Sequence, residues 1–552
     1  MRVPLGGRVV RGWVIRVDDS PREGLKAVRR ISGDHTVFSP QLLETLQWAA
    51  HHYVAPVSSL LKKTSPPNLP RRATAKALPE VPSGLDGVFT PLGVSAVEGG
   101  AGPPAVVVGS VSTAAVISAA VPVLSSDHSV MVVFPTGLEA QRFFDQAAGL
   151  GARRILVHPE MSDRQVTDRW SRVRDQSGYL LVGTERIALW PVAGLRLAWI
   201  VGDGRRGLKA RQTPTLHVRE LLRSRAAGER FSLVLSSVVP STEAVAGGAR
   251  LIVQPGRLWP RTEVIDRGED PPGGGVVGTR ARAAIAAAAR QGKPAFVFTH
   301  RHGYAPAFRC VSCRTLRVCE VCEARAVGKT LCARCGSPLE PCRKCAGRVF
   351  EPMGAGEGRV LAELTKFVAP ALVGPIDSAG PVWVGTERDL PRVTARHMAI
   401  AVDADGLIFG TNYRAPETAL RLLARVAGTV ATSAGARFIV QTARPSHPII
   451  QALQRGEPLD LLKAMIEERR RERLPPAGQL LVLDVTRPPS WLPESLAKLS
   501  CDLLGPIEYG DRLRWLLQGT SLDRDKRVLR GIVQDARDAG ARVRVDADPI
   551  DL

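Results

Sequence analysis

Eight of the nine cysteines lie in one short segment and form four pairs, each with two residues between the partners. The pairs are Cys310 and Cys313, Cys319 and Cys322, Cys332 and Cys335, and Cys342 and Cys345. Two cysteines at this spacing can chelate one metal ion from a single tight turn, and a structural zinc ion takes four thiolates in a tetrahedron. The spacing therefore predicts two zinc ions per chain, each held by four cysteines.

Disulfide bonds and an iron–sulfur cluster are the competing interpretations of these cysteines. Disulfides are disfavoured because the N-terminus has no apolar signal-peptide core and the chain is long enough to form its own core. The spacing leaves the pairing open. Adjacent pairs can share a metal, or the two middle pairs can hold one ion while the two outer pairs hold the other.

The chain is strongly basic, with a formal net charge of +22. Arg offers planar, bidentate donors that suit phosphates and base edges, so nucleic acid is the first partner to expect. The cysteine segment carries basic residues too, namely Arg314, Arg317, Arg325, Lys329, Arg334, Arg343, Lys344 and Arg348. A solvated surface explains them as well as a nucleic-acid contact does. No apolar run is long enough to span a bilayer, so we expect a cytoplasmic protein with no membrane partner.

Alternating apolar runs and helical patterns predict a multidomain α/β protein. Two RecA-like lobes in tandem are expected, as in helicases, with a zinc ribbon inserted in the second, a small β-rich N-terminal domain and a small α+β C-terminal domain. The predicted boundaries are 1–66 for the N-terminal domain, 67–104 for a linker or reduced insert, 105–248 and 249–441 for the lobes, 308–350 for the zinc insertion and 442–552 for the C-terminal domain.

The expected ATP site lacks its usual residues. A phosphate-binding loop needs a second Gly followed by Lys and Ser or Thr, but Gly109 is followed by Ser-Val-Ser-Thr-Ala-Ala. An acidic pair should end a later strand, and only Asp203 stands there. Gly109 and Asp203 are therefore read as a degenerate nucleotide site, and bound ATP is not expected.

Several motifs together resemble the family of the primosomal replication-restart protein N-prime (PriA), a fork-binding superfamily 2 DNA helicase. They are Arg301-His-Gly-Tyr-Ala-Pro-Ala before the cysteine pairs, Asp403-Ala-Asp-Gly406, Tyr413-Arg-Ala-Pro-Glu417, Val426-Ala-Gly428, Gln441-Thr442, His447-Pro448, Glu467-Glu-Arg-Arg470 and Pro475-Pro476. Upstream, Val3-Pro-Leu-Gly6 and Leu25-Lys26-Ala-Val28 resemble the family's domain for the 3′ end of the nascent leading strand. The resemblance covers nearly the whole chain.

The resemblance implies DNA contacts at Gly6 and Lys26 and the nested arrangement of the two zinc sites. It also implies fork DNA and single-stranded DNA as ligands. The protein partners that it implies are primosome or replicative-helicase loading proteins and single-stranded DNA-binding protein, in a nucleoid-associated location.

The chain departs from the family at five nucleotide-handling elements, including Thr429 and Thr432 where the family has arginine fingers. We therefore expect a replication-restart protein that recognises stalled or branched forks and recruits replication proteins, and we expect no enzyme activity. The alternative is an active ATP-dependent 3′–5′ DNA helicase of the same family. A zinc protein acting on RNA or in translation is a third hypothesis.

Overall fold

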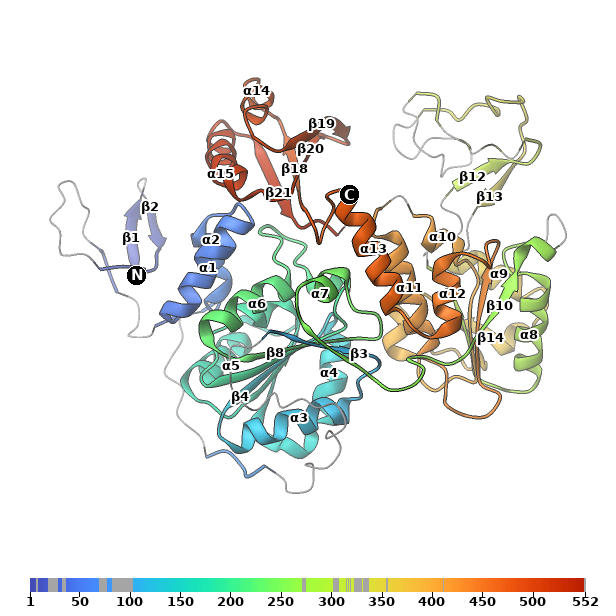
Figure 1. Cartoon of the computed structure of the whole chain (residues 1–552), viewed down its shortest axis with the longest axis horizontal. Helices are drawn as coiled ribbons and strands as arrows, with labels where there is room; N and C mark the ends of the chain where they lie inside the picture. The colour runs from blue at the N-terminus through green and yellow to red at the C-terminus, as the bar shows by residue number, and fades with distance from the viewer. Residues whose placement is uncertain are drawn as a thin grey trace. The chain divides into compact units, whose positions relative to one another are not determined.

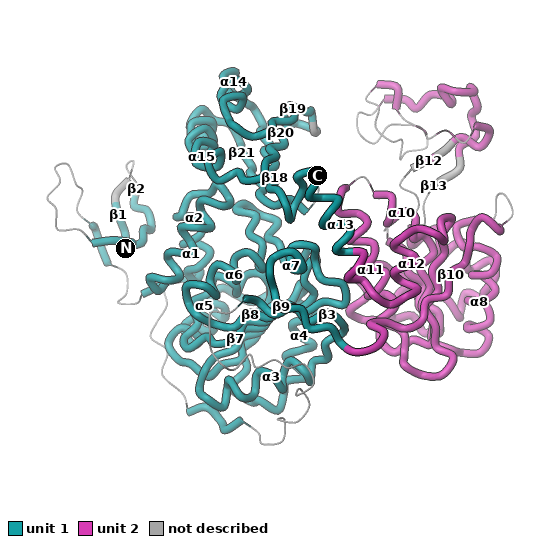
Figure 2. The backbone as a smooth tube through the Cα atoms, in the orientation of Figure 1, with its two compact units in different colours: residues 1–254, 462–552 teal, residues 255–461 magenta. Residues whose placement is uncertain are grey.

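A computed structural model describes residues 1–5, 8–17, 28–31, 36–68, 77–81, 103–270, 275–300, 307–313, 315, 317, 319–321, 330, 337–353, 356–410 and 412–550. The chain divides into two compact units, coloured separately in Figure 2. The first combines residues 1–254 with 462–552, and the second comprises residues 255–461. Each unit is built around its own sheet or sheets (Figure 1).

The centre of the first unit is a seven-stranded parallel sheet in the order β5-β6-β4-β7-β8-β3-β9. Its strands are β3 (Ala105–Val108), β4 (Ser129–Val133), β5 (Arg154–Val157), β6 (Leu180–Gly183), β7 (Leu195–Val201), β8 (Ser232–Ser237) and β9 (Arg250–Val253). The helices around it are α3 (Thr113–Ser125), α4 (Gly137–Gln146), α5 (Asp163–Asp175), α6 (Val218–Glu229) and α7 (Thr242–Ala246). Helices α3 and α4 cover one face of the sheet, and α5 and α6 cover the other (Figure 1).

Short apolar runs form these strands because both faces of a helix-covered parallel sheet are buried. All four residues of β3 are buried, for example. Side-chain caps begin the helices that follow: the Ser112 hydroxyl accepts a hydrogen bond from the Ala115 N–H at the start of α3. Strand β9 pairs with β3, so this sheet continues to Val253, beyond the boundary expected at residue 248.

The second unit contains a six-stranded parallel sheet in the order β10-β17-β16-β11-β15-β14. Its strands are β10 (Thr262–Asp266), β11 (Ala295–Phe298), β14 (Val373–Pro375), β15 (Val382–Gly385), β16 (Met398–Ala401) and β17 (Arg437–Thr442). Its helices are α8 (Thr279–Arg290), α9 (Glu357–Leu364), α10 (Asp405–Ile408), α11 (Ala415–Ala427) and α12 (Pro448–Arg455). Helices α8 and α9 pack on one face, and α11 and α12 pack on the other (Figure 1).

A separate hairpin, β12 (Ala307–Cys310) and β13 (Phe350–Met353), is inserted between β11 and α9. It carries the cysteine segment. The insertion therefore lies within the second parallel domain, after its first central strand.

The remaining elements belong to the two ends of the chain. They are β1 (Arg2–Leu5), β2 (Arg8–Arg11), α1 (Pro40–His52), α2 (Val57–Thr64), α13 (Leu459–Arg471), β18 (Gln479–Thr486), α14 (Leu492–Leu496), β19 (Asp502–Tyr509), β20 (Arg512–Gly519), α15 (Asp523–Asp538) and β21 (Arg542–Ala547). The C-terminal strands form an antiparallel sheet in the order β19-β20-β18-β21, with α15 against it.

The predicted mixed α/β class, with two parallel-sheet domains and an insertion that carries a four-cysteine cluster, is confirmed. Among the described residues, no helix has the length and apolar character needed to cross a membrane.

Candidate metal centre and predicted site residues

Four cysteines converge at the end of the inserted hairpin where β12 finishes and β13 begins. The ligand atoms of Cys310, Cys313, Cys342 and Cys345 all lie within 4.8 Å of one another. The Sγ–Sγ distance is 3.4 Å both between Cys310 and Cys345 and between Cys313 and Cys342, compared with about 2.05 Å in a disulfide bond. Four sulfurs around a tetrahedral zinc ion, with Zn–S bonds of about 2.3 Å, lie about 3.8 Å apart. The cluster thus has the dimensions of a four-thiolate zinc site.

The two contributing pairs sit on turns with the same backbone hydrogen bond. The Cys310 N–H donates to the Thr315 carbonyl at 2.9 Å, and the Cys342 N–H donates to the Gly347 carbonyl at 2.9 Å. Pairing of β12 with β13 then places these turns side by side, because Cys310 lies opposite Phe350 in the antiparallel register. The hairpin is therefore what brings the first and last cysteine pairs together.

Gly347 keeps space open beside the sulfurs. A Cβ atom at this position would lie 3.1 Å from the Cys310 Sγ and 3.2 Å from the Cys345 Sγ. Both distances are tighter than ordinary contacts, so a side chain here would press on two of the four ligand atoms. A residue without a side chain fits a site in which all four sulfurs must approach one ion.

The thiols affect one another's ionisation. Hydrogen bonds from Thr315 and contacts with neighbouring thiols lower the pKa of Cys313 to about 6. The Gly347 backbone lowers the pKa of Cys345, but Cys310 and Cys313 outweigh it and raise that pKa to about 12. Four crowded thiols cannot all ionise without a cation among them, and metal binding supplies that charge. Four soft sulfur ligands leave no open position, so such a site is structural.

This cluster joins the first cysteine pair to the fourth, which is the outer set of the nested arrangement. Of the inner set, Cys319 is buried, while Cys322, Cys332 and Cys335 lie outside the described residues. The two predicted DNA contacts, Gly6 and Lys26, also lie outside them.

The predicted nucleotide-site residues follow two strands of the first sheet at their carboxyl ends. Gly109 follows β3 with φ of +136°, and a Cβ atom there would lie 2.2 Å from the Gln254 side chain. The Gln254 amide in turn donates to the Ser110 carbonyl at 2.9 Å. The Gln254 side chain, which follows β9, therefore packs against the loop after β3 and is hydrogen-bonded to it.

Asp203 follows β7 and is fully buried. Its carboxylate accepts hydrogen bonds from Arg219 Nη1 at 3.0 Å, the Ser241 N–H at 2.9 Å and the Ser241 hydroxyl at 2.6 Å. Sequence reasoning did not identify Arg219, which lies in the first turn of α6. Its buried guanidinium has its pKa lowered by burial, but Asp203, Glu220 and Glu243 outweigh that effect and raise it. Nothing in the local sequence indicates that this arginine is the partner of Asp203.

Comparison with known proteins gives matches across the chain. Residues 1–66 match a domain family described as PriA 3′DNA-binding domain (3′BD). A probable replication restart protein PriA of Mycobacterium leprae is 27% identical, over 63% of this chain and 58% of that protein. The replication restart protein PriA of Synechocystis sp. is 24% identical, over 71% of this chain and 55% of that protein. The chain thus spans less than two thirds of the length of these relatives.

Among solved structures, the chain is similar to RecG bound to a three-way DNA junction, with a TM-score of 0.36 and 10% identity over 66% of this chain and 43% of that one. It is also similar to S. cerevisiae Dbp5 bound to RNA and ADP BeF3, with a TM-score of 0.37 and 9% identity over 66% of this chain and 89% of that one.

These matches correct one prediction. The expectation that the chain is not an enzyme is wrong, because the chain matches replication restart proteins PriA over 63% and 71% of its length, and the family that its motifs resemble is one of DNA helicases. The prediction gave local departures around Gly109 and Asp203 more weight than similarity along the chain.

Proposed function

We propose that the chain is a member of the family of replication restart proteins PriA, and that it binds stalled or branched DNA forks and recruits replication proteins to them. The observation that carries the proposal is the match of residues 1–66 to a 3′ DNA-binding domain. The net charge of +22 supports a polyanionic ligand. Fork DNA and single-stranded DNA are the proposed ligands, in a nucleoid-associated, cytoplasmic protein.

The N-terminal hairpin supports a DNA contact. Arg2 and Arg11 are direct cross-strand partners on β1 and β2. Burial lowers the pKa of Arg11, and the nearby charge of Arg2 lowers it further. Like charges directly opposite each other destabilise a hairpin. A phosphate backbone beside the hairpin would offset that repulsion, so the pair fits a surface that meets DNA.

The test is binding to a fork with a recessed 3′ end and to a plain duplex, each measured across a salt series. We expect the fork to bind more tightly, and we expect Arg2→Gln with Arg11→Gln to weaken fork binding and reduce the salt slope by about 1 to 2. Arg196→Gln, an exposed arginine on β7, is the matched control. Equal affinity for fork and duplex would rule out fork recognition.

We propose two structural zinc ions, one on Cys310, Cys313, Cys342 and Cys345 and the other on Cys319, Cys322, Cys332 and Cys335. The geometry of the outer four sulfurs supports the first site. The second extends the same spacing.

Elemental analysis tests both zinc sites. We expect two zinc ions per chain, loss of one and the same ion in Cys310→Ser and Cys345→Ser, and loss of the other in Cys319→Ser. Gly347→Val should weaken the outer site without removing a ligand, because its side chain would meet two sulfurs. A content of one zinc or none would refute the assignment.

The zinc module and its basic residues are the proposed contact surface for primosome or replicative-helicase loading proteins and for single-stranded DNA-binding protein. Capture of these proteins on the immobilised chain, with and without zinc removal by a chelator, measures that contact. Unchanged capture after zinc loss would place the contact elsewhere.

ATP-dependent 3′–5′ unwinding of DNA is a second candidate, favoured by the similarity to replication restart proteins PriA. Its test is ATP turnover with fork DNA present, comparing the natural chain with Asp203→Ala purified in the same way. Turnover that requires DNA and is lost in the variant supports this activity, whereas turnover at the background rate refutes it.

A further inference from the structure

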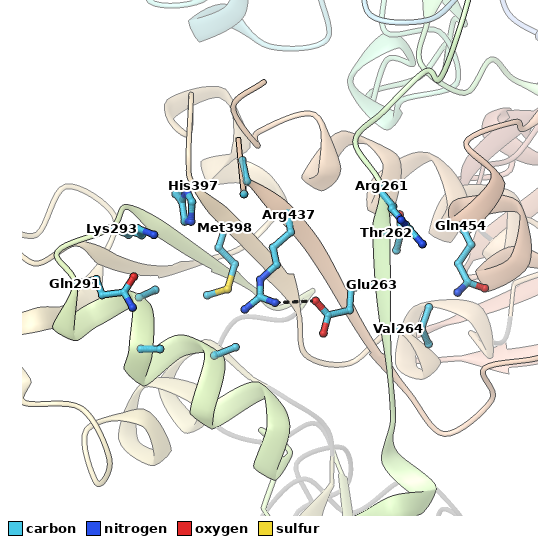
Figure 3. Close-up of a pocket in the computed structure, with 15 residues that line it drawn as sticks. Arg261, Thr262, Glu263, Val264, Gln291, Lys293, His397, Met398, Arg437 and Gln454 are labelled. Atoms are coloured by element: carbon cyan, nitrogen blue, oxygen red, sulfur yellow. Dashed lines mark hydrogen bonds and ion pairs between the residues drawn. The ribbon is translucent and has the colours of Figure 1, made fainter. Parts of the chain in front are cut away.

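The second unit contains a pocket of about 710 Å³ that none of the predicted sites uses. It lies at the amino ends of β10, β16 and β17, beneath the C-terminal half of α8 (Figure 3). Ligands of parallel α/β sheets usually bind at the opposite edge, where the carboxyl ends of the strands lie. This pocket is therefore separate from the edge that would hold ATP.

Small residues on α8 leave the pocket open. The core on this face of the sheet is filled farther along by Ile285 of α8 against Ile265 and Ile439. Toward the amino ends of the strands, α8 instead presents the short side chains of Ala284, Ala287 and Ala288 to the pocket. The result is an apolar wall facing a polar floor.

The floor is an ion pair beside a thioether. Arg437 and Glu263 lie 3.0 Å apart and cross the floor between β17 and β10, with Met398 next to them (Figure 3). Arg437 and Met398 are direct partners in the register of β17 and β16, so their side chains share one face of the sheet. The guanidinium uses part of its donor set on Glu263 and keeps further N–H groups for a ligand.

The rim of the pocket is positive. Lys293 and His397 lie on the same side as Arg437, although the three come from separate segments (Figure 3). Within the described residues, no carboxylate forms an ion pair with Lys293 or His397. Burial lowers the pKa of His397, and the charges of Lys293 and Arg437 lower it further. Two cations, Lys293 and Arg437, share one acid, Glu263, and the neutral imidazole of His397 lies beside them, so the rim keeps a surplus of positive charge that an anion would neutralise.

We propose that this pocket binds a nucleotide, whose phosphate contacts Lys293, His397 and Arg437 while its base or sugar lies against Met398 and the alanine wall. The volume falls in the range of small-molecule sites, and the combination of an apolar wall with a few convergent polar groups is typical of them. A free nucleotide and the phosphorylated end of a single DNA strand present the same chemistry. The proposal goes beyond fork recognition and ATP turnover.

The experiment uses the full chain labelled at its methionine methyl groups, followed by NMR in magnesium-free buffer. The chain has six methionines, so the Met398 signal can be assigned from its loss in Met398→Leu. The probes are inorganic phosphate, dAMP, and a short single-stranded oligonucleotide with and without a 5′-phosphate. Variants Lys293→Gln and Ala287→Phe remove a cation and fill the pocket. Their controls are Arg290→Gln and Ala283→Phe, two exposed residues of α8 that do not line the pocket.

We expect dAMP to shift the Met398 signal at lower concentration than inorganic phosphate does. Lys293→Gln should weaken dAMP binding about fivefold, as for loss of one exposed charge contact. Ala287→Phe should abolish it, and the two controls should leave it unchanged. If the 5′-phosphorylated strand shifts the signal more than dAMP does, the ligand is a DNA end; the reverse order identifies a free nucleotide. A Met398 signal unmoved by every probe, or shifts equal in all variants, would overturn the proposal.

Discussion

The ion pair between Arg219 and Asp203 gives a sharp prediction for Arg219→Met. The side chains are 5% and 0% exposed, and Nη1 lies 3.0 Å from Oδ1. Methionine keeps much of the length of arginine but removes its charge, so Asp203 would stay buried, hydrogen-bonded to Ser241 but without the charge of Arg219. Breaking a buried pair from one side costs about 3–5 kcal/mol, since it leaves an uncompensated charge. We expect the free energy of unfolding of the first unit to fall by about that amount.

Urea unfolding followed by tryptophan fluorescence measures this change. Trp199 is fully buried on β7, the strand that leads to Asp203, and its indole N–H donates to the Ser236 hydroxyl at 2.9 Å. The control is a double-mutant cycle with Asp203→Asn, which removes the charge that Arg219 balances. The double variant should be more stable than the sum of the single effects predicts, by about 1–3 kcal/mol. Additive effects, or a loss below about 0.5 kcal/mol in Arg219→Met, would refute the reasoning.

Two further predictions concern stability. Burial raises the pKa of Asp548, but His52 at 2.6 Å, with Lys526 and Lys209, outweighs it and holds that pKa below its usual range. A carboxyl whose pKa is depressed in the folded state stabilises the fold above the unfolded value of about 3.9, and this stabilisation is lost as the pH falls. In urea unfolding, the free energy of unfolding should therefore fall more between pH 7 and pH 3 in the natural chain than in Asp548→Asn, by about 1–2 kcal/mol. Identical pH profiles would contradict this. Gly109→Ala should lower the free energy of unfolding by about 1–3 kcal/mol, measured by thermal or urea unfolding, because Gly109 has a positive φ and its added Cβ would meet Gln254. The control is Gly149→Ala, whose added Cβ has no heavy atom within 4 Å. Equal effects of the two substitutions would count against the explanation.

The parallel sheets could be predicted because their central strands are continuous apolar runs. Strand β3, Ala-Val-Val-Val, is one such run, and all four of its residues are buried. Strand β10, Thr-Glu-Val-Ile-Asp, has no such apolar run because three of its five residues are polar, and it is a strand through its pairing with β17. The local sequence of a segment does not show which distant strand it will pair with.

At the cysteine cluster too, the local sequence predicts one part of the site and distant contacts decide the other. Spacing predicts that the cysteines are metal ligands but does not say which pairs combine. The first and last pairs come together because Cys310 lies opposite Phe350 in the antiparallel register, which joins the two ends of the insertion. Arg219 is a clearer case still, since it meets Asp203 only because α6 packs beside the end of β7.

The first unit also shows that residues 40–64 are built into the first parallel domain, although they lie within the match to a 3′ DNA-binding domain. Helix α1 packs on α6, and the Tyr53 hydroxyl accepts a hydrogen bond from the His217 N–H at 3.0 Å. The buried indole N–H of Trp170 donates to the Thr64 carbonyl at 2.9 Å. Deleting residues 1–66 would expose the α6 surface and leave the Trp170 donor unpaired, at a cost of about 1–3 kcal/mol for that group alone. A truncated chain that fails to bind DNA would therefore say little about DNA recognition, and the paired arginines of the hairpin are the more decisive place to test it.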